Sequence, residues 1–368
     1  MSLFDRWTGA LDELRGQGRY RSFRLPQGID FTSNDYLGYG AEPRSTPPLP
    51  VSGISSRLLR GHHEIWDEVE TMLAAWHGAE AALMMTSGYN ANEGLIATLA
   101  EPGDWVAADE LSHACIVDGL RLARPRKFLF KHNDLNHLED GLKSETAKRP
   151  AGREMFVITE SLFSMDGDTA PLDELAILTQ RHGAHLIVDE AHSTGCFGAT
   201  GVEMQPPAGS RPLASIHTGG KALGLPGAYI CGSKLLKEYL VNKCRHLIFT
   251  TALPPAIGAW WREQIPRVQA EHSRREKLHR NAALFRARLA EQGIDPPGSH
   301  YVVPVIVGED EPAVREAHML QQAGFDVRAI RPPSVPHGTC RLRISIHANH
   351  EEADLLRLAE VVAMAVRS

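Results

Sequence analysis

The chain has 368 residues, of which 43% are hydrophobic and 23% are charged, and its formal net charge is -6. A chain of this length and apolar content can bury more than one core, so we expect a large domain with a smaller one beside it. The mild acidic balance argues against nucleic acid as the main partner, and no segment approaches the roughly 18 consecutive apolar residues that span a bilayer.

Apolar residues at helical spacing predict a short amphipathic helix over residues 4–16 and another over residues 64–77. From residue 81 onward, short apolar runs alternate with helical stretches. The runs predict buried strands at residues 81–86, 105–108, 155–159 and 185–188, and the stretches predict helices at residues 88–99, 116–122 and 172–182. This alternation predicts a mainly parallel sheet covered by helices.

The pattern changes after Pro254 and Pro255. A long charged helix is expected over residues 256–292, followed by alternating segments at residues 301–307 and 341–346, and together they predict a smaller α+β domain. We therefore expect three parts, which are an N-terminal helix and extended arm (1–45), a large domain (46–255) and a small C-terminal domain (256–368).

The five cysteines are scattered and form no C-x-x-C pair. This spacing predicts neither a disulfide framework nor a zinc site, so we expect no metal and a reducing cytoplasm. The N-terminal residues 1–24 lack the apolar core of a secretory signal peptide.

Asp189 ends the apolar strand predicted at residues 185–188. Ligands of open α/β sheets bind at the carboxyl ends of the strands, and a carboxylate buried there needs a cationic partner. A protonated pyridine ring would provide that charge and would become an electron sink, as in pyridoxal 5'-phosphate (PLP) chemistry. Taken alone, Asp189 fits a helix cap or a structural arginine's partner equally well.

Lys221 lies in a turn of glycine and alanine residues, which leaves its amine open to a carbonyl compound. Thr218, shortly before it, could donate a hydrogen bond to a phosphate group. A solvated surface lysine is the alternative for an isolated Lys. Because Lys221 follows Asp189 by one strand and one crossover, the pair indicates a cofactor site more specifically than either residue does.

Three further segments carry polar groups to the ends of predicted strands. The turn at residues 86–92, with Gly88 and Tyr89, opens a helix and could bind a phosphate through its backbone amides, although an ordinary glycine turn has the same pattern. His113 could stack on a cofactor ring, but it is one of 18 histidines. Residues 160–168 lack the spacing of a calcium loop, so they are expected to face the same cleft without a metal.

These motifs, in this order, resemble the α-oxoamine synthases, which are the acyl-CoA-dependent branch of the fold-type I PLP enzymes. The resemblance runs from Phe31 to about Glu351. It implies an α/β fold-type I PLP-dependent transferase, in which a large domain with a mainly parallel central sheet carries a smaller α+β C-terminal domain. It also implies PLP as the cofactor and a homodimer.

The resemblance implies four catalytic residues: Lys221 binds the cofactor covalently, Asp189 pairs with its ring nitrogen, His192 bonds its phenolic oxygen and His113 stacks on its ring. The other cofactor-binding positions are Gly88, Tyr89, Ser164, Thr218 and Thr251, with Thr250 as the alternative to Thr251 at a phosphate bound across the dimer interface. The substrate-binding positions are Arg21, Asn34, Ser334 and Arg343, with Arg19 as the alternative to Arg21.

The segment at residues 330–343 is most similar to the members that condense L-alanine with a pimeloyl thioester, either pimeloyl-CoA or pimeloyl carrier protein. Those members form 8-amino-7-oxononanoate, CO2 and a free thiol in biotin biosynthesis. Three alternatives remain open, which are a related synthase that uses glycine or serine with another acyl-CoA, a catalytically silent partner subunit, and a plain aminotransferase. The chain departs from the family at Trp66, where many relatives have His, and in the loop over residues 201–213.

Overall fold

The computed structural model describes residues 1–202 and 211–367, so most of the loop over residues 201–213 lies outside the described residues. Contacts divide the chain into two compact units. We call them the large unit (Asn34–Ser164 and Asp168–Lys277) and the small unit (Met1–Ser33, Met165–Gly167 and Leu278–Ser368). The predicted boundaries differ from these units, because the N-terminal arm belongs with the C-terminal residues and residues 256–277 belong with the central sheet.

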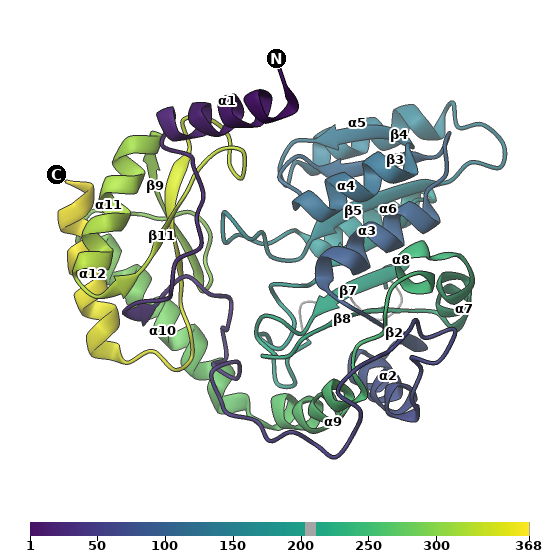
Figure 1. Cartoon of the computed structure of the whole chain (residues 1–368). Helices are drawn as coiled ribbons and strands as arrows, with labels where there is room; N and C mark the ends of the chain where they lie inside the picture. Colours follow the sequence, from purple (N-terminus) through teal and green to yellow (C-terminus); the bar gives the residue numbers. More distant parts are fainter. Residues whose placement is uncertain (203–210, 368) are drawn as a thin grey trace. The chain divides into compact units, whose positions relative to one another are not determined.

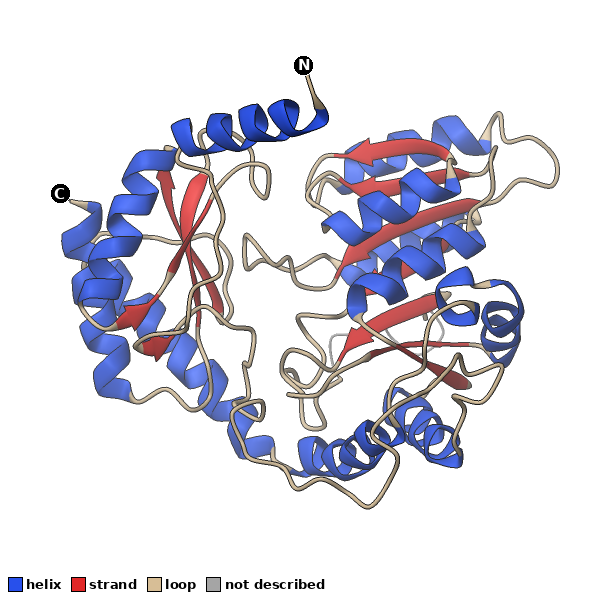
Figure 2. Cartoon of the chain, in the orientation of Figure 1, coloured by secondary structure: helices blue, strands red, loops and turns tan. Residues whose placement is uncertain are grey.

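The large unit is built on a seven-stranded sheet with the strand order β2-β8-β7-β6-β5-β3-β4 (Figures 1 and 2). β8 pairs antiparallel with both of its neighbours, and the other pairs are parallel, which confirms the predicted mainly parallel sheet. The strands are β2 (Ala81–Met85), β3 (Trp105–Asp109), β4 (Arg126–Phe130), β5 (Met155–Glu160), β6 (His185–Asp189), β7 (Ala214–Thr218) and β8 (Ala228–Gly232).

Helices cover both faces of this sheet. On β5, Phe156 and Ile158 pack with α3, α4 and α7, whereas Met155 and Val157 pack with α5 and α6 on the other face. This alternation follows from the two-residue period of a strand, and burial on both faces explains why the strands are continuous apolar runs. The helices of the unit are α2 (Glu64–His77), α3 (Gly88–Leu99), α4 (Ala114–Ala123), α5 (Leu135–Thr146), α6 (Leu172–His182), α7 (Lys234–Lys243), α8 (Arg245–Ile248) and α9 (Pro255–Ala270).

The single long helix predicted over residues 256–292 is wrong. The structure has two helices there, α9 (Pro255–Ala270) and α10 (His272–Glu291), and Glu271 between them leaves the helical region at φ -83° and ψ 61°. The buried guanidinium of Arg275 donates hydrogen bonds to the backbone carbonyls of Val268 and Gln269. These carbonyls at the end of α9 therefore have a partner that does not require the helix to continue.

The small unit contains a three-stranded antiparallel sheet in the order β11-β12-β9 and a short parallel pair, β1 with β10. The predicted segments at residues 301–307 and 341–346 correspond to β9 and β12. The elements are α1 (Leu3–Gly16), β1 (Ile29–Asp30), β9 (Val302–Gly308), α11 (Asp310–Gln322), β10 (Phe325–Asp326), β11 (Arg328–Ile330), β12 (Cys340–Ser345) and α12 (Glu352–Val366).

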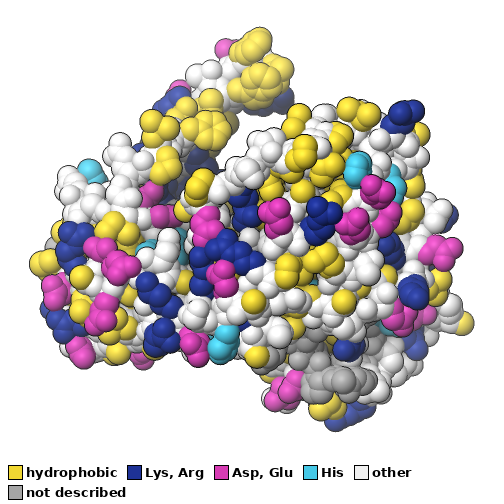
Figure 3. Space-filling model, turned by 90° about the horizontal axis from the view of Figure 1, so that it is seen from below, with side chains coloured by type: hydrophobic (Ala, Val, Ile, Leu, Met, Phe, Trp, Pro, Cys, Tyr) yellow, Lys and Arg dark blue, Asp and Glu magenta, His cyan; other side chains and the backbone are white. Residues whose placement is uncertain are grey.

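The surface carries both signs of charge. On the face seen in Figure 3, Lys and Arg side chains are interspersed with Asp and Glu side chains. Of the helices in the described ranges, none is long and apolar enough to cross a membrane.

Candidate cofactor and substrate site

Three neighbouring strands of the large unit end in polar residues that the sequence placed at a ligand site. Glu160 ends β5, Asp189 ends β6 and Thr218 ends β7, and Glu160 pairs in register with Asp189. Because these strands are parallel, their carboxyl ends meet at one edge of the sheet, where ligands of α/β proteins bind. Lys221 follows β7 at the same edge.

The Asp189 carboxylate is buried and held by two donors. Its Oδ2 accepts a hydrogen bond from Nδ2 of Asn92 at 2.8 Å, and its Oδ1 accepts one from the backbone N–H of Ala191 at 2.8 Å. Nδ2 of Asn92 also donates to the carbonyl of Gly88 at 3.2 Å. The start of α3 is thus tied to the carboxylate, and Asn92 fixes the direction in which Asp189 points.

The first turn of α3 adjoins Thr218. A Cβ atom built on Gly88 would lie 3.4 Å from the Cβ of Thr218 and 3.5 Å from its Oγ1, so the glycine backbone and the threonine hydroxyl lie side by side. Ser87 caps the helix, with its Oγ accepting from the N–H of Asn90 at 3.2 Å. A helix N-terminus next to a hydroxyl provides N–H and O–H donors for a phosphate group.

His113 precedes α4 and is anchored by a carboxylate. Its backbone N–H donates to Oε1 of Glu160 at 2.6 Å, and its Nδ1 accepts from the N–H of Cys115 at 3.3 Å. Burial lowers the pKa of His113, the charge of Asp189 raises it, and the charge of Lys221 lowers it. The charges of Asp189 and Lys221 therefore lie close enough to the His113 ring to act on it electrostatically.

Glu160 itself is fully buried. Burial and the neighbouring Asp189 charge together raise the pKa of Glu160 to about 8, although the hydrogen bond from His113 and the charge of Lys221 lower it. A carboxyl group with this pKa can keep a proton near neutral pH, so a second negative charge beside Asp189 is avoided.

His192 is connected to Asn34 through a tyrosine. Nδ1 of His192 lies 2.7 Å from the hydroxyl oxygen of the fully buried Tyr36, and that hydroxyl donates to Oδ1 of Asn34 at 3.0 Å. The chain of contacts holds the His192 ring in one orientation. It also brings a predicted substrate residue, Asn34, next to a predicted cofactor residue.

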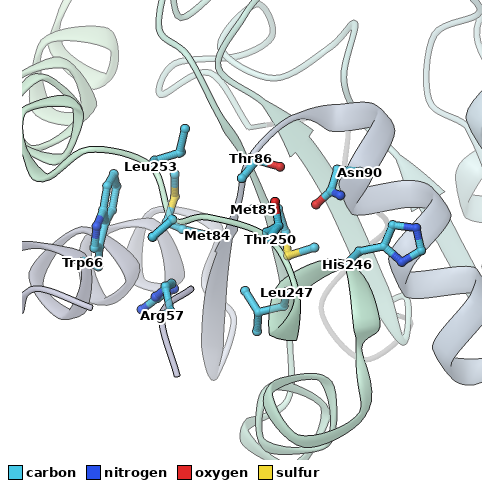
Figure 4. Close-up of a pocket in the computed structure, with 11 residues that line it drawn as sticks. Arg57, Trp66, Met84, Met85, Thr86, Asn90, His246, Leu247, Thr250 and Leu253 are labelled. Atoms are coloured by element: carbon cyan, nitrogen blue, oxygen red, sulfur yellow. The ribbon is translucent and has the colours of Figure 1, made fainter. Parts of the chain in front are cut away.

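The remaining cofactor positions of the large unit differ in their surroundings. Ser164 is buried and follows β5 closely in the chain. The hydroxyl of Tyr89 donates a hydrogen bond to Asp118, and the Tyr89 ring lies edge-on to the His113 ring, with the two ring centroids 6.2 Å apart. Thr250 lines a small pocket of about 20 Å³ beside the first turn of α3 (Figure 4). Thr251 is exposed and is not part of that lining, so which of the two threonines reaches a phosphate across the dimer interface stays a prediction.

The other predicted substrate residues lie in the small unit. Arg343 is buried on β12, and its Nη1 donates to Oγ of Ser345 at 2.8 Å. Arg21 and Ser334 line one hollow of about 240 Å³, and Arg19 lines it as well. The guanidinium of Arg19 forms an ion pair with Asp310, whereas Arg21 is exposed to solvent.

Comparison with known proteins agrees with this geometry. The aminotransferase class I and II family matches residues 26–362. An 8-amino-7-oxononanoate synthase of Geobacter sulfurreducens is 43% identical, with 97% of this chain and 96% of the relative covered. One from Chlorobaculum parvum is 41% identical, with 87% and 85% covered. The chain belongs to the 8-amino-7-oxononanoate synthase family.

Solved structures of α-oxoamine synthases share the fold. A serine palmitoyltransferase from S. paucimobilis with PLP and myriocin bound is 28% identical, has a TM-score of 0.89, and covers 100% of this chain and 99% of its own. An 8-amino-7-oxononanoate synthase from Francisella tularensis is 27% identical with a TM-score of 0.75, and the coverage is 92% of this chain and 98% of that one. Together with the family match, they show the fold-type I PLP transferase fold.

PLP, the cofactor of this 8-amino-7-oxononanoate synthase family, fits the residues at this edge of the sheet. The buried Asp189 carboxylate matches a protonated ring nitrogen, and the turn at Gly88 with Thr218 matches a phosphate. Oδ1 of Asn92 is buried without a hydrogen-bond partner among the described residues, which leaves an acceptor at the same edge. Lys221 would hold the cofactor covalently.

Sequence analysis gave no role to three residues that hold the predicted site residues in place. Asn92, Tyr36 and Glu160 hold Asp189, His192 and His113, respectively. A local signal existed for Asn92, because it lies one helical turn after Gly88 in the phosphate-binding turn. Nothing in the local sequence indicated the partners of Tyr36 and Glu160, since those contacts join distant segments.

The described residues include a group that could hold a metal ion, formed by His77, His217 and Cys231 in the large unit. Their ligand atoms lie within 4.8 Å of one another, and all three side chains are buried. The imidazole nitrogens are already paired with hydroxyl groups: Nε2 of His77 with Tyr229 at 2.7 Å, and Nδ1 of His217 with Thr194 at 2.8 Å. These contacts describe a neutral buried hydrogen-bond network.

Proposed function

We propose that this chain condenses L-alanine with a pimeloyl thioester to form 8-amino-7-oxononanoate, CO2 and a free thiol, a step of biotin biosynthesis. The single observation that supports this most strongly is that Glu160, Asp189 and Thr218 end three neighbouring parallel strands at one edge of the sheet, where Lys221 follows β7. The names of the relatives at 41–43% identity support the choice of substrates.

PLP supplies an electron sink that accepts the electron pair of the broken Cα–H bond. The Asp189 carboxylate would keep the ring nitrogen of bound PLP charged, and Asn92 and Ala191 keep the carboxylate pointed in one direction. The Lys221 amine removes the α-proton of alanine, because its place in an open glycine turn gives it access to the substrate. His192 would form a hydrogen bond with the phenolic oxygen of bound PLP, with its ring oriented by Tyr36.

The reaction has two stages, and in each stage one bond forms as another breaks. A carbon–carbon bond forms between the α-carbon of alanine and the thioester carbonyl, and the carbon–sulfur bond breaks, so the thiol leaves. The bond between the α-carbon and the carboxylate then breaks, CO2 departs, and the α-carbon takes a proton. Asn34 and Arg343 are proposed to bind the carboxylate of alanine, and Arg21 and Ser334 to bind the acyl chain.

We also propose that the protein acts as a homodimer in the cytoplasm. Helix α1 leaves Phe4, Trp7, Leu11 and Leu14 exposed in the single chain, which supports burial against another copy. The five cysteines are free thiols, which supports a reducing compartment.

The test is free-thiol release from pimeloyl-CoA with L-alanine, together with the mass of the product. We expect a product with the mass of 8-amino-7-oxononanoate and its loss in Lys221→Ala. Turnover of this pair by Lys221→Ala at the unaltered rate would refute the proposed mechanism.

A second candidate is a synthase that uses serine and another acyl-CoA. It is supported by the higher TM-score of the serine palmitoyltransferase structure, 0.89 against 0.75. Thiol release measured with alanine, glycine and serine in parallel separates the candidates, since the proposed function requires alanine to be preferred.

A further inference from the structure

His132 forms a bridge between two carboxylates of the large unit. It lies two residues beyond β4, at the carboxyl edge of the sheet. Nδ1 of its ring lies 2.9 Å from Oδ1 of Asp109, which ends β3, and Nε2 lies 2.7 Å from Oδ2 of Asp168. An ionised carboxylate only accepts hydrogen bonds, so a ring paired with carboxylates at both nitrogens donates from both and is an imidazolium.

The surroundings of the ring favour this charged form. Burial lowers the pKa of His132, but the two carboxylates outweigh burial and raise the pKa to about 10. The ring is also held from the side, because the Phe163 ring lies edge-on to it with the two centroids 4.4 Å apart. At neutral pH the bridge therefore places one positive charge between two negative charges, and hydrogen bonds between charged groups are roughly twice as strong as neutral ones.

One end of the bridge fixes the turn that leads to His113. The Asp109 carboxylate is buried, and its Oδ1 accepts a hydrogen bond from the backbone N–H of Leu111 at 2.9 Å. Its Oδ2 accepts one from the backbone N–H of Asn133 at 3.0 Å. The carboxylate therefore joins the turn after β3, which precedes His113, to the residues after β4.

The other end of the bridge fixes the segment that contains Ser164. The backbone carbonyl of Asp168 accepts a hydrogen bond from the N–H of Phe163 at 2.9 Å, so the segment folds back on itself at this point. Nδ2 of Asn133 donates to Oδ2 of Asp168 at 2.9 Å and to the carbonyl of Thr169 at 3.2 Å. Two neighbouring side chains after β4 thus hold the same carboxylate.

We propose that His132 is a positioning residue of the cofactor site, which holds the turn before His113 and the segment that carries Ser164 at a fixed separation. His113 and Ser164 are the predicted cofactor residues on these two segments, so the bridge sets where they lie relative to the ring of bound PLP. His132 itself takes no part in the bond changes. The turnover arm of the test rests on the proposed function, whereas the other two arms do not.

The first arm follows hydrogen exchange in the apoprotein. Asp168→Ala removes one end of the bridge and leaves the contact of His132 with Asp109, and His132→Gln removes the charge. We expect the Phe163 amide to exchange about tenfold faster in both variants, because a hydrogen bond between charged groups is lost. Exchange along β5 should stay unchanged, which shows that the variants are folded; Asp168→Asn, which keeps the size of the side chain, replaces Asp168→Ala if that variant unfolds.

Asp67→Ala is the matched control. Oδ2 of Asp67 lies 3.1 Å from Nε2 of His62, so this variant also breaks an Asp–His pair of the large unit, but one on α2 at the surface. It should leave both the exchange of the Phe163 amide and the spectrum of bound PLP as they are in the unaltered protein.

The second arm is the visible circular dichroism of the PLP-loaded protein. PLP has no stereocentre, so this signal reports how the site holds the ring. At saturating PLP, the signal should change in Asp168→Ala and His132→Gln and stay unchanged in Asp67→Ala. In the third arm, kcat with alanine and pimeloyl-CoA should fall by about tenfold in both variants, while the KM for alanine stays within about twofold, since the proposed alanine-binding residues are not part of the bridge.

The inference is overturned if the Phe163 amide exchanges in Asp168→Ala and His132→Gln as it does in Asp67→Ala. It is also overturned if exchange becomes faster while the circular dichroism of bound PLP stays unchanged, because the bridge would then stabilise the loop without positioning the cofactor. If the unaltered protein releases no thiol from pimeloyl-CoA with alanine while the first two arms give the expected results, the proposed function fails and the positioning role of His132 stands.

Discussion

Replacing Asn92 with alanine removes the side-chain donor that orients the Asp189 carboxylate. In the structure, Nδ2 of Asn92 lies 2.8 Å from Oδ2 of Asp189, and the backbone N–H of Ala191 lies 2.8 Å from Oδ1. The variant keeps the second donor and loses the first. Oδ2 of Asp189 then lacks the Asn92 donor, so the carboxylate can rotate away from the cofactor ring.

A hydrogen bond to a charged group contributes about 1.5–3 kcal/mol, which corresponds to a change of about 10- to 150-fold in a binding constant. Because the Ala191 donor remains, we expect the lower end of this range, about a tenfold weaker affinity for PLP. Turnover at saturating PLP should also fall, since the ring nitrogen is held less well in the reaction.

The assay is an absorbance titration of the apoprotein with PLP, followed by thiol release at saturating cofactor. Asn242→Ala on α7 is the control, because among the described residues the side chain of Asn242 donates only to the local carbonyl of Glu238, at 2.8 Å. Thermal unfolding of both apoproteins separates a cofactor effect from a folding defect. Affinity for PLP within about twofold of the unaltered protein, with unchanged turnover, would refute this role of Asn92.

Three further predictions concern the same site. Lys221→Ala should bind PLP without a covalent link, so mass spectrometry after borohydride reduction should find no cofactor adduct; an adduct would exclude Lys221 as the attachment point. Tyr36→Phe should lower kcat by about 2- to 13-fold, the equivalent of one neutral hydrogen bond to His192, whereas Tyr239→Phe on α7 should not; equal rates would contradict the orienting role. Burial raises the pKa of Glu160 from 4.5 to about 8. The folded chain therefore keeps a proton that the unfolded chain has lost between these values, and the contribution of Glu160 to the free energy of unfolding falls as the pH rises through that window. Glu160→Gln should flatten this dependence in urea unfolding of the apoprotein at about pH 5 and about pH 8, and an unchanged slope would show that Glu160 is not the titrating group.

The sequence by itself predicted four strands of the central sheet and pointed to the two central residues of the candidate site. The apolar runs predicted β2, β3, β5 and β6 because strands buried on both faces must be apolar throughout. Asp189 and Lys221 could be recognised because each lies at a strand end or in a glycine turn, which are local signals.

Only the tertiary structure decided which side chains meet. Asn92 reaches Asp189 across 97 positions of the chain, and Tyr36 reaches His192 across 156. The break at Glu271 depends on Arg275, whose hydrogen bonds to carbonyls exist only once α9 and α10 have formed. Such contacts are set by how the chain folds back on itself, and local periodicity and spacing do not carry that information.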